Sequence, residues 1–401
     1  MEGDGWVRLG IDARYAFRQS RRGIGEYVAE LLRHLPACAA ADDEFLLYLD
    51  GPADPGALVL PDGRFRLRQL GAGNPLLWEE VALPVAAAQD GLDLLHLTAN
   101  YGPSLRPCPT VYTIHDLIEF LRPTLGPMRL PLRHAAGRAV RVRTLPRQAR
   151  GARRVITISE ASRQDLLRIL HLRNERVVVI PQGVSEALRP AADAAAARES
   201  LRAQGYRVPE RYVLAMGALD PRKNGPFLLR AFARARADLP DVSLWVVGVE
   251  RPAEYPLPFA TAPDWLVLDG FLPREALVRA LQGAAAFAYP SLYEGFGLPV
   301  LEAMACGVPV LSSDSSALPE VVGGAGLLFD PRSEPQLAAA LRRLLGDPAL
   351  AESCRAAARA QVARFSWAAT AEKTYAVYRE VYREVCREVQ GGVSRKAAGS
   401  A

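Results

Sequence analysis

The chain alternates short apolar runs with longer segments in which apolar residues recur every three or four positions. The short runs are mostly continuous, which is typical of strands buried on both faces. The longer segments have the period of amphipathic helices. This alternation predicts parallel sheets covered by helices on both sides. The predicted strands are 6–12, 44–50, 92–98, 109–116 and 153–159 in the first half, and 211–219, 242–248, 265–271, 285–291, 308–314 and 324–330 in the second.

The strand series restarts after an extended stretch that contains proline and glycine. The predicted helices are 25–35, 160–170, 226–236, 274–284, 298–307 and 334–347. We place a domain boundary at Gly183, which gives domains 1–183 and 184–365, each long enough to bury a core. Two doubly wound domains would face each other across a cleft, with ligands at the carboxyl ends of the strands.

The end of the chain predicts one more helix. Residues 366–390 carry aromatic side chains at near-helical spacing, so this helix should pack back on the body, toward the N-terminal domain. The small and polar residues 391–401 predict a disordered tail. The aromatic positions are Trp367, Tyr375, Tyr378 and Tyr382.

Composition narrows the class of protein. Half of the 401 residues are hydrophobic and the formal charge is +5, as in ordinary globular proteins. The five cysteines are dispersed, which is typical of reduced thiols in a cytoplasmic protein. The first residues lack the apolar core of a signal peptide, and no run of about 18 apolar residues occurs. We therefore expect a cytoplasmic protein whose membrane contact, if any, is peripheral.

Arginines cluster between Arg129 and Arg154 without any acid among them. Because leucines and valines are interleaved with them, this arginine belt suits the surface of an anionic bilayer on the inner face of the cell membrane. It would also attract nucleic acid, but no nucleic-acid motif accompanies it, so no such partner is expected. The alternative is a solvated helix face. The belt consists of Arg129, Arg133, Arg138, Arg141, Arg143, Arg147, Arg150, Arg153 and Arg154.

One stretch, SLYEGFGLPVLEAMACG, places Glu294 and Glu302 around a turn that contains Gly295, Gly297 and Pro299. The helix that starts after the glycines offers unpaired N–H groups and roughly half a positive charge, which favours a diphosphate. An ionised carboxylate only accepts hydrogen bonds, so it suits sugar hydroxyls. The stretch thus predicts a sugar-nucleotide site. The local alternative is that Glu302, expected in the first helical turn, merely stabilises the helix.

From Glu294 onward, EGFGLPVLEAMACGVPVLSSDSSALPEVVGGAGLLFDP resembles the signature of the retaining glycosyltransferases of family 4. The resemblance continues in GALDPRKN, DGFLPREAL and VITISEASRQDLL, and in the shorter matches GIDAR, GIGEY and TIHDL. It covers nearly the whole chain. It implies the α/β GT-B fold, with two doubly wound Rossmann-like domains facing a cleft.

The resemblance implies roles for the residues of the second domain. Glu302 resembles the acid that binds the donor ribose, and Glu294 the acid that contacts hydroxyls of the transferred sugar. Arg222 and Lys223 resemble the cations that neutralise the diphosphate and stabilise the leaving group. Phe271 resembles the residue against the base, although an aromatic at a strand end is more often core. The backbone that would cradle the diphosphate belongs to Phe296, Gly297, Leu298, Pro299 and Val300.

In the first domain the resemblance implies that His115 lies beside the transferred sugar, in the cleft, and bonds a hydroxyl. Asp116 is a weaker candidate, since it also fits a turn cap. The loop Gly23–Ile24–Gly25 resembles the one that closes over the phosphates and borders the acceptor. Ser162 and Asp165 fit a capping box, which we interpret as structural.

No metal site is expected. The chain lacks an Asp-x-Asp pair, its histidines form no ligand cluster, and the resembled family is metal-independent. We expect no cofactor; the donor is a nucleoside-diphosphate sugar, with GDP-mannose preferred. The hypothesis is retention of the anomeric configuration, with the acceptor attacking the face that the diphosphate leaves. The rival mechanism uses Glu294 as a covalent nucleophile.

The predicted function is transfer of a hexose, mannose by preference, to an oligosaccharide or lipid-linked glycan in polysaccharide biosynthesis. The alternatives are a sugar-nucleotide epimerase of the same fold or a glycogen-synthase-like polymerase. A dehydrogenase fits less well, because Val28 replaces the third glycine in GIGEYV, which lies far from the strand end. A non-catalytic sugar-binding protein would not need Lys223, Glu294 and Glu302 for donor turnover.

Overall fold

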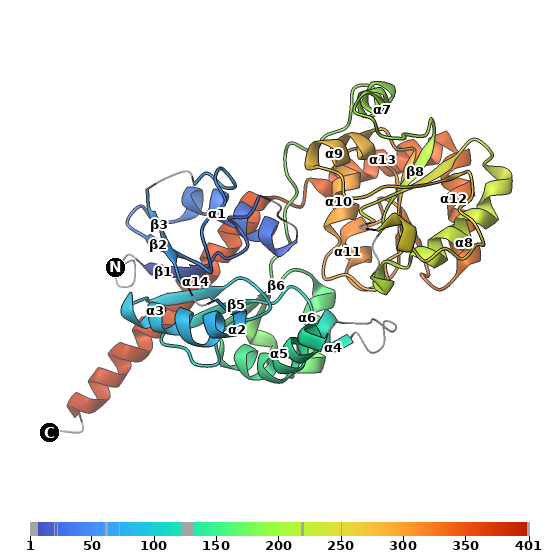
Figure 1. Ribbon diagram of the computed structural model, residues 1–401. Coiled ribbons are helices and arrows are strands. Elements are labelled where there is room, and N and C mark those ends of the chain that lie inside the picture. Colours follow the sequence, from blue (N-terminus) through green and yellow to red (C-terminus); the bar gives the residue numbers. More distant parts are fainter. Residues whose placement is uncertain are drawn as a thin grey trace. The chain divides into compact units, whose positions relative to one another are not determined.

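The computed structural model describes residues 7–19, 21, 23–60, 63–71, 73–121, 132–217, 220–249 and 251–398, with the backbone alone for 132–136, 252 and 391–398. The chain divides into two compact α/β units (Figure 1). The first consists mainly of residues up to 119, 130–183 and the segment from Trp367 onward, and the second mainly of 184–366.

The first unit contains a parallel sheet of seven strands in the order β3-β2-β1-β4-β5-β6-β7. All five predicted strands of this half are confirmed, whereas β3 and β7 were not predicted as strands. β3 lies at the sheet edge and alternates apolar residues with arginines, so it lacks a continuous apolar run. The strands are β1 (Arg8–Asp12), β2 (Glu44–Leu49), β3 (Phe65–Gln69), β4 (Leu94–Leu97), β5 (Thr110–Thr113), β6 (Arg154–Thr157) and β7 (Val177–Val179).

Helices cover this sheet, and two of them were predicted from their periodicity. Helix α6 begins after Ser159, whose hydroxyl accepts a hydrogen bond from the N–H of Ser162 at 3.0 Å. The capping box predicted at Ser162 is therefore wrong, because that hydroxyl donates instead to the carbonyl of His115. The helices are α1 (Ile24–Cys38), α2 (Pro75–Leu77), the π-helix η1 (Trp78–Ala82), α3 (Leu83–Gln89), α4 (Ile118–Leu121), α5 (Leu132–Gly151), α6 (Glu160–Leu170) and the 3₁₀ turn η3 (Asn174–Arg176).

The C-terminal helix α14 (Trp367–Ala398) belongs to the first unit. Trp367 and Tyr378 are buried in the same core as Tyr27 and Leu31 of α1. The prediction of a disordered tail is wrong for residues 391–398, because α14 continues to Ala398. Two glycines begin this stretch, and the residues after them include several that favour helix. Residues 399–401 lie outside the described residues.

The second unit contains a parallel sheet of six strands in the order β10-β9-β8-β11-β12-β13. All six predicted strands are confirmed. They are β8 (Tyr212–Met216), β9 (Ser243–Val247), β10 (Leu266–Leu268), β11 (Ala286–Tyr289), β12 (Val310–Ser313) and β13 (Leu327–Phe329). The helices are α7 (Ala194–Ala203), η4 (Pro221–Lys223), α8 (Gly225–Ala235), η5 (Arg236–Asp238), η6 (Pro252–Glu254), α9 (Arg274–Gln282), α10 (Leu298–Ala305), α11 (Leu318–Val322), α12 (Glu334–Gly346) and α13 (Pro348–Val362).

Both sheets reverse their strand order once, as a doubly wound fold requires. The reversal lies between β1 and β4 in the first unit and between β8 and β11 in the second. Ligands of such sheets bind beyond the carboxyl ends of the strands at the reversal. The loops that follow these strands are therefore where a site is expected. Within the described residues, no helix has a long enough apolar stretch to cross a bilayer.

Candidate functional site

Lys223 and Glu294 follow the two strands at which the second sheet reverses. Lys223 comes after β8 and Glu294 after β11, and these strands pair in parallel. The carboxyl ends of neighbouring parallel strands meet at one edge, so two side chains 71 residues apart in the sequence come into contact. Lys223 Nζ donates to Glu294 Oε1 at 2.7 Å and to the hydroxyl of Tyr289 at 2.6 Å.

The two oxygens of Glu294 differ. Oε1 accepts hydrogen bonds from Lys223, from Tyr289 at 3.0 Å and from Ser291 at 2.5 Å. Among the described residues, no group donates to Oε2. The carboxylate is thus held rigidly through one oxygen, and the other can accept hydrogen bonds from a ligand.

Electrostatics keeps this pair ionised. Burial by itself raises the pKa of Glu294, but the ammonium of Lys223 and the hydroxyl of Ser291 outweigh burial and lower it. Burial by itself lowers the pKa of Lys223, and its neighbours Tyr289 and Glu294 reverse that effect and raise it. The site therefore presents a fixed carboxylate and a fixed cation at neutral pH.

Helix α10 starts at this site after a turn that only glycine can make. Gly297 has a φ of 111°, and a Cβ there would lie 2.5 Å from Cδ2 of Leu318. Among the described residues, the N–H groups of Phe296, Gly297 and Leu298 have no hydrogen-bond partner. Pro299 has no N–H and that of Val300 bonds the Gly297 carbonyl at 2.9 Å, so the predicted cradle is limited to three donors.

Glu302 lies in the second turn of α10, not in the first as predicted, because the helix begins at Leu298. Its Oε1 accepts a hydrogen bond from Arg274 Nη1 at 2.6 Å, and only 14% of its side chain is exposed. The position is too far into the helix for the local stabilising role that was the alternative. Its contact with a ribose stays a prediction.

The other predicted donor residues surround the same sheet edge. Arg222 donates twice to Oδ2 of Asp220, at 2.9 and 2.6 Å, so its charge is partly neutralised. Asp220 was not predicted as the partner of Arg222. Phe271 follows β10 and is 54% exposed, which rules out the core position that was the alternative.

His115 lies at the carboxyl end of β5 and is enclosed by the first unit. Its Nε2 donates to the carbonyl of Thr98 at 2.9 Å, and Nδ1 faces the amide of Gln182 at 3.5 Å. The ring of Tyr27 meets the imidazole edge-on at 4.8 Å. Since the Thr98 carbonyl can only accept, Nε2 carries the proton, and Nδ1 accepts from the Gln182 amide. A substrate hydroxyl would have to take the place of Gln182 to bond this nitrogen.

Burial lowers the pKa of His115 to about 4, although its bond to the Thr98 carbonyl opposes the shift. The folded imidazole is neutral between pH 4 and 6.5, where the unfolded chain binds an extra proton, so stability rises with pH across this window. His115→Asn should therefore reduce the loss of unfolding free energy between pH 7 and pH 5 by about 2 kcal/mol. Urea unfolding at the two pH values measures this loss. If His115→Asn loses as much unfolding free energy as the wild type, the lowered pKa of His115 is wrong. The control is His171→Asn at an exposed site, which should leave this loss unchanged.

A second buried histidine joins α14 to this region. His96 bonds the hydroxyl of Tyr378 through Nδ1 at 2.6 Å and that of Thr113 through Nε2 at 2.8 Å. Tyr27 bonds the same Thr113 hydroxyl at 3.2 Å. A buried series of hydrogen bonds thus runs from α14 to Tyr27, whose ring contacts His115. Of these residues, only Tyr378 was assigned a role from the sequence, as a packing aromatic, and the hydrogen bonds were not predicted.

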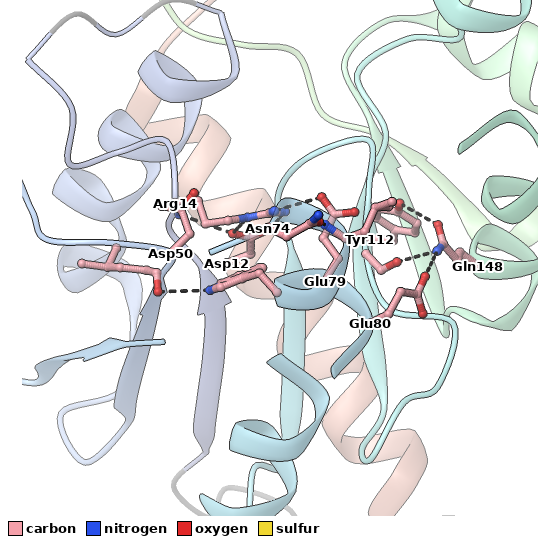
Figure 2. Close-up of polar contacts among 12 residues, drawn as sticks. Asp12, Arg14, Asp50, Asn74, Glu79, Glu80, Tyr112 and Gln148 are labelled. Atoms are coloured by element: carbon pink, nitrogen blue, oxygen red, sulfur yellow. Dashed lines mark hydrogen bonds and ion pairs between the residues drawn. The ribbon is translucent and has the colours of Figure 1, made fainter. Parts of the chain in front are cut away.

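A buried ion cluster orders the loop after β1, at the reversal of the first sheet. Figure 2 shows Arg14 between Asp12 and Glu79. The guanidinium bonds both oxygens of Asp12, at 2.9 and 2.8 Å, and Glu79 at 2.9 Å, and it lies 4.0 Å from the ring centroid of Trp78. Burial raises the pKa of Glu79, and Arg14 offsets this only in part. The motif GIDAR contains Asp12 and Arg14, but nothing local pointed to Glu79.

A second polar network in Figure 2 ties η1 to α5. Gln148 lies between the hydroxyl of Tyr112, at 3.5 Å, and Oε1 of Glu80, at 3.4 Å. Glu80 also accepts from the N–H of Ser104 at 2.8 Å. These contacts fix the helix that carries part of the arginine belt against the sheet.

Gly23, Ile24 and Gly25 form the start of α1, the helix that follows β1. Gly23 has a φ of 48°, and a Cβ on Gly25 would lie 2.8 Å from the carbonyl of Tyr15. The loop therefore follows β1, one of the two strands at the reversal of the first sheet. Its contact with the phosphates and the acceptor stays a prediction. Asp116 accepts from the N–H of Ile118 at 3.0 Å, which is the turn cap that was its alternative role.

The arginine belt is not one uniform face. Arg153 pairs with Glu388 of α14, and Arg154 with Glu380 and Glu384. Arg138 pairs with Glu119, and Arg141 lies 3.7 Å from the ring centroid of Tyr101. Three exposed arginines remain on one face of α5, while Arg129 lies outside the described residues and the side chain of Arg133 is not described. The exposed three are Arg143, Arg147 and Arg150.

Comparison with known proteins identifies relatives of both units. Residues 21–188 match the family profile described as "Glycosyltransferase Family 4", and residues 197–361 match "Glycosyl transferases group 1". The chain is similar to O-antigen chain mannosyltransferase B of Escherichia coli, with 31% identity over 389 residues that cover 89% of this chain and 96% of that one.

Two further likenesses are more limited. Serotype-specific mannosyltransferase WbdA of Escherichia coli is 32% identical over 224 residues, which cover 54% of this chain and 27% of the longer relative. The structure of sucrose-phosphate synthase from Thermosynechococcus elongatus superposes with a TM-score of 0.70 and 24% identity, covering 94% of this chain and 99% of that one. The latter concerns the fold alone.

Proposed function

The chain belongs to glycosyltransferase family 4 and is a glycosyltransferase with a GT-B fold, and from that premise we propose that it transfers mannose from a nucleoside-diphosphate sugar. The transfer proceeds with retention of configuration and without a divalent metal. The acceptor is an oligosaccharide or a lipid-linked glycan. Mannose is the sugar named for two of its relatives, mannosyltransferase B and WbdA.

The observation that carries the proposal is the Lys223–Glu294 pair at the start of α10. Glu294 is fixed through Oε1, which leaves Oε2 to accept hydrogen bonds from hydroxyls of the sugar. Lys223 provides a fixed positive charge where the diphosphate leaves, and the three N–H groups at the turn before α10 point to the same role. Hydroxyl and phosphate recognition thus lie side by side, as a nucleotide sugar requires.

In the proposed reaction the bond between the anomeric carbon and the diphosphate oxygen breaks as the acceptor oxygen forms its bond on the same face. The acceptor proton passes to the departing phosphate oxygen. Lys223, Arg222 and the start of α10 stabilise the charge that develops there. These residues take the role that a divalent ion has in other transferases.

A panel of sugar nucleotides tests the function. The full chain is incubated with GDP-mannose, GDP-glucose, UDP-glucose and ADP-glucose, with and without EDTA, and the release of nucleoside diphosphate is measured. We expect slow hydrolysis of GDP-mannose that EDTA does not inhibit and that a short mannoside acceptor accelerates. Interconversion of the donor without transfer would instead favour the epimerase. Loss of all activity in EDTA would refute metal independence.

Acceptor binding is proposed for the first unit, at the reversal of its sheet. Tyr15 follows β1 and is 37% exposed, and Tyr101 follows β4 with Arg141 stacked on its ring. Aromatic faces pack against sugar rings, and a guanidinium without a carboxylate partner among the described residues adds hydrogen-bond donors. The buried cluster of Arg14 holds this loop in place.

Peripheral contact with an anionic membrane is proposed through Arg143, Arg147 and Arg150. Replacing all three by glutamine should weaken partition onto anionic vesicles about a hundredfold, since each arginine contributes about 1 kcal/mol near such a surface. Flotation with phosphatidylglycerol vesicles measures the bound fraction. A control with the same charge loss replaces three exposed arginines elsewhere, Arg173, Arg332 and Arg359. If the wild-type chain shows no preference for anionic lipid, the proposal fails.

A further inference from the structure

A pocket of about 520 Å³ opens at the amino-terminal edge of the first sheet, away from the edge that carries His115. It is lined by the loop 104–109 between β4 and β5, by Thr110 at the start of β5, and by Gly151 and Arg153 just before β6. None of the residues proposed for sugar transfer lines it. The pocket lies within the first unit alone.

Two guanidinium groups line this pocket, and none of its lining residues is an acid. Arg153 is held by Glu388 through bonds of 2.7 and 2.6 Å. Arg106 donates one hydrogen bond within the described residues, to the carbonyl of Arg147 at 3.4 Å, and has no carboxylate partner among them. A Cβ on Gly151 would lie 2.1 Å from Arg106 Nη2, so the guanidinium rests directly on this glycine. The pocket thus contains a fixed charge that no acid of the described chain neutralises.

Thr110 provides an independent observation. The residue is 2% exposed, and its hydroxyl has no hydrogen-bond partner among the described residues. Buried hydroxyls are almost always paired, because an unpaired one loses its bonds to water without replacement. A buried hydroxyl without a partner, on the wall of a cationic pocket, indicates that a ligand provides the missing partner.

We propose that this pocket binds a phosphate group, carried either by a phospholipid or by a soluble phosphorylated molecule. The planar fork of Arg106 matches two phosphate oxygens, and Thr110 donates to a third. The exposed Arg147 and Arg150 of α5 add positive potential around the pocket. Leu105, which is 78% exposed, provides apolar surface beside the phosphate for the group that carries it.

Titration calorimetry with inorganic phosphate tests the site. The full chain carries Lys223→Ala in every sample, so that the donor site contributes little phosphate binding. Arg106→Gln should weaken phosphate binding about tenfold or more. Gly151→Ala, which displaces Arg106 without a change of charge, and Thr110→Val should each weaken it about tenfold. The matched control is Arg143→Gln, which removes an exposed charge from α5, the helix that ends at Gly151. It should change the affinity for phosphate less than about twofold.

Two results would overturn the proposal. One is the absence of phosphate binding in the Lys223→Ala chain, and the other is an equal loss in Arg143→Gln and Arg106→Gln. Thr110→Val should leave the melting temperature unchanged or raise it, because it removes an unpaired hydroxyl. A large drop in that temperature would show that Thr110 has a structural partner. Sugar transfer is measured in a separate assay. A chain that fails to transfer sugar could therefore still bind phosphate in this pocket.

Vesicle flotation identifies the source of the phosphate. If the source is a lipid, Gly151→Ala and Thr110→Val, which keep the net charge, should each reduce binding to phosphatidylglycerol vesicles several-fold relative to the parent chain. If the source is a soluble molecule, these variants bind vesicles like the parent chain while their calorimetric affinity for phosphate still falls. Unchanged behaviour in both experiments would refute the site.

Discussion

Replacing Lys223 by alanine is expected to lower kcat/KM for the sugar nucleotide about a thousandfold. The ammonium is held 2.7 Å from Glu294 and 2.6 Å from the Tyr289 hydroxyl, so it is already oriented before the diphosphate leaves. Removal of one preorganised charge donor at a developing anion lowers turnover about 10² to 10³-fold, and weaker donor binding adds to the loss. Steady-state donor hydrolysis and calorimetry with GDP measure the two parts.

The matched control is Lys373→Ala, which removes an exposed lysine from α14. It should retain wild-type kinetics, although it loses the same formal charge. If Lys223→Ala keeps more than about a tenth of the wild-type kcat/KM, Lys223 does not stabilise the departing diphosphate and the proposed site is wrong.

The same substitution should change stability in a pH-dependent way. The pKa of Glu294 is lowered in the folded protein, so the pair stabilises the fold above the unfolded pKa of about 4.5, and this contribution is lost as the pH falls through the folded pKa. Lys223→Ala leaves a nearly buried carboxylate without its cation, which costs about 3 kcal/mol at pH 7. The difference from wild type should shrink toward pH 3. Urea unfolding at both pH values measures it, and a constant difference would contradict the ion pair.

Replacing Glu294 by glutamine is expected to lower kcat about a hundredfold or more, with a smaller change in KM for the donor. The amide occupies the same volume, but its nitrogen cannot accept hydrogen bonds from hydroxyls of the sugar, and Lys223 loses its counter-charge. The loss should therefore appear in the reaction step. Single-turnover kinetics with saturating GDP-mannose separates this step from binding.

Glu302→Gln provides the comparison. Glu302 lies one turn further along α10 and is proposed to bind the ribose, so its loss should raise KM more than it lowers kcat. Equal kinetic changes in the two variants would refute the separate roles. A glycosyl adduct on Glu294, trapped with a slow fluorinated donor and found by mass spectrometry, would establish the covalent mechanism in place of the direct one.

The sequence predicted what local patterns control. Continuous apolar runs gave all the strands of the second unit and five of the first, because a strand buried on both faces must be apolar throughout. The edge strand β3 was missed because its arginines interrupt the run. The turn before α10 was also recognisable from local residues. Gly297 accepts a positive φ, and Pro299 is favoured in the first turn of a helix, so together they indicate a strand-to-helix turn.

The partners of the site residues were not predictable in this way. Glu294 and Lys223 were both named, but their contact depends on β8 and β11 being neighbours, which is a matter of strand order. The pairs Arg222–Asp220 and Glu302–Arg274 change how much charge each residue presents, and no spacing in the sequence announces them. His115 was placed correctly at a strand end, yet only the folded unit shows that Thr98 and Gln182 enclose it.

By itself the sequence determined the type and succession of elements and the residue types at the turn, since periodicity, glycine and proline act within a few residues. Tertiary structure alone decided which loops share a sheet edge. It thereby set which oxygen of Glu294 is open, how Glu79 reaches Arg14, and why the hydroxyl of Thr110 is buried without a partner. Charges and hydrogen bonds depend on distances of a few ångströms between residues far apart in the chain, and only the packing of the sheets fixes those distances.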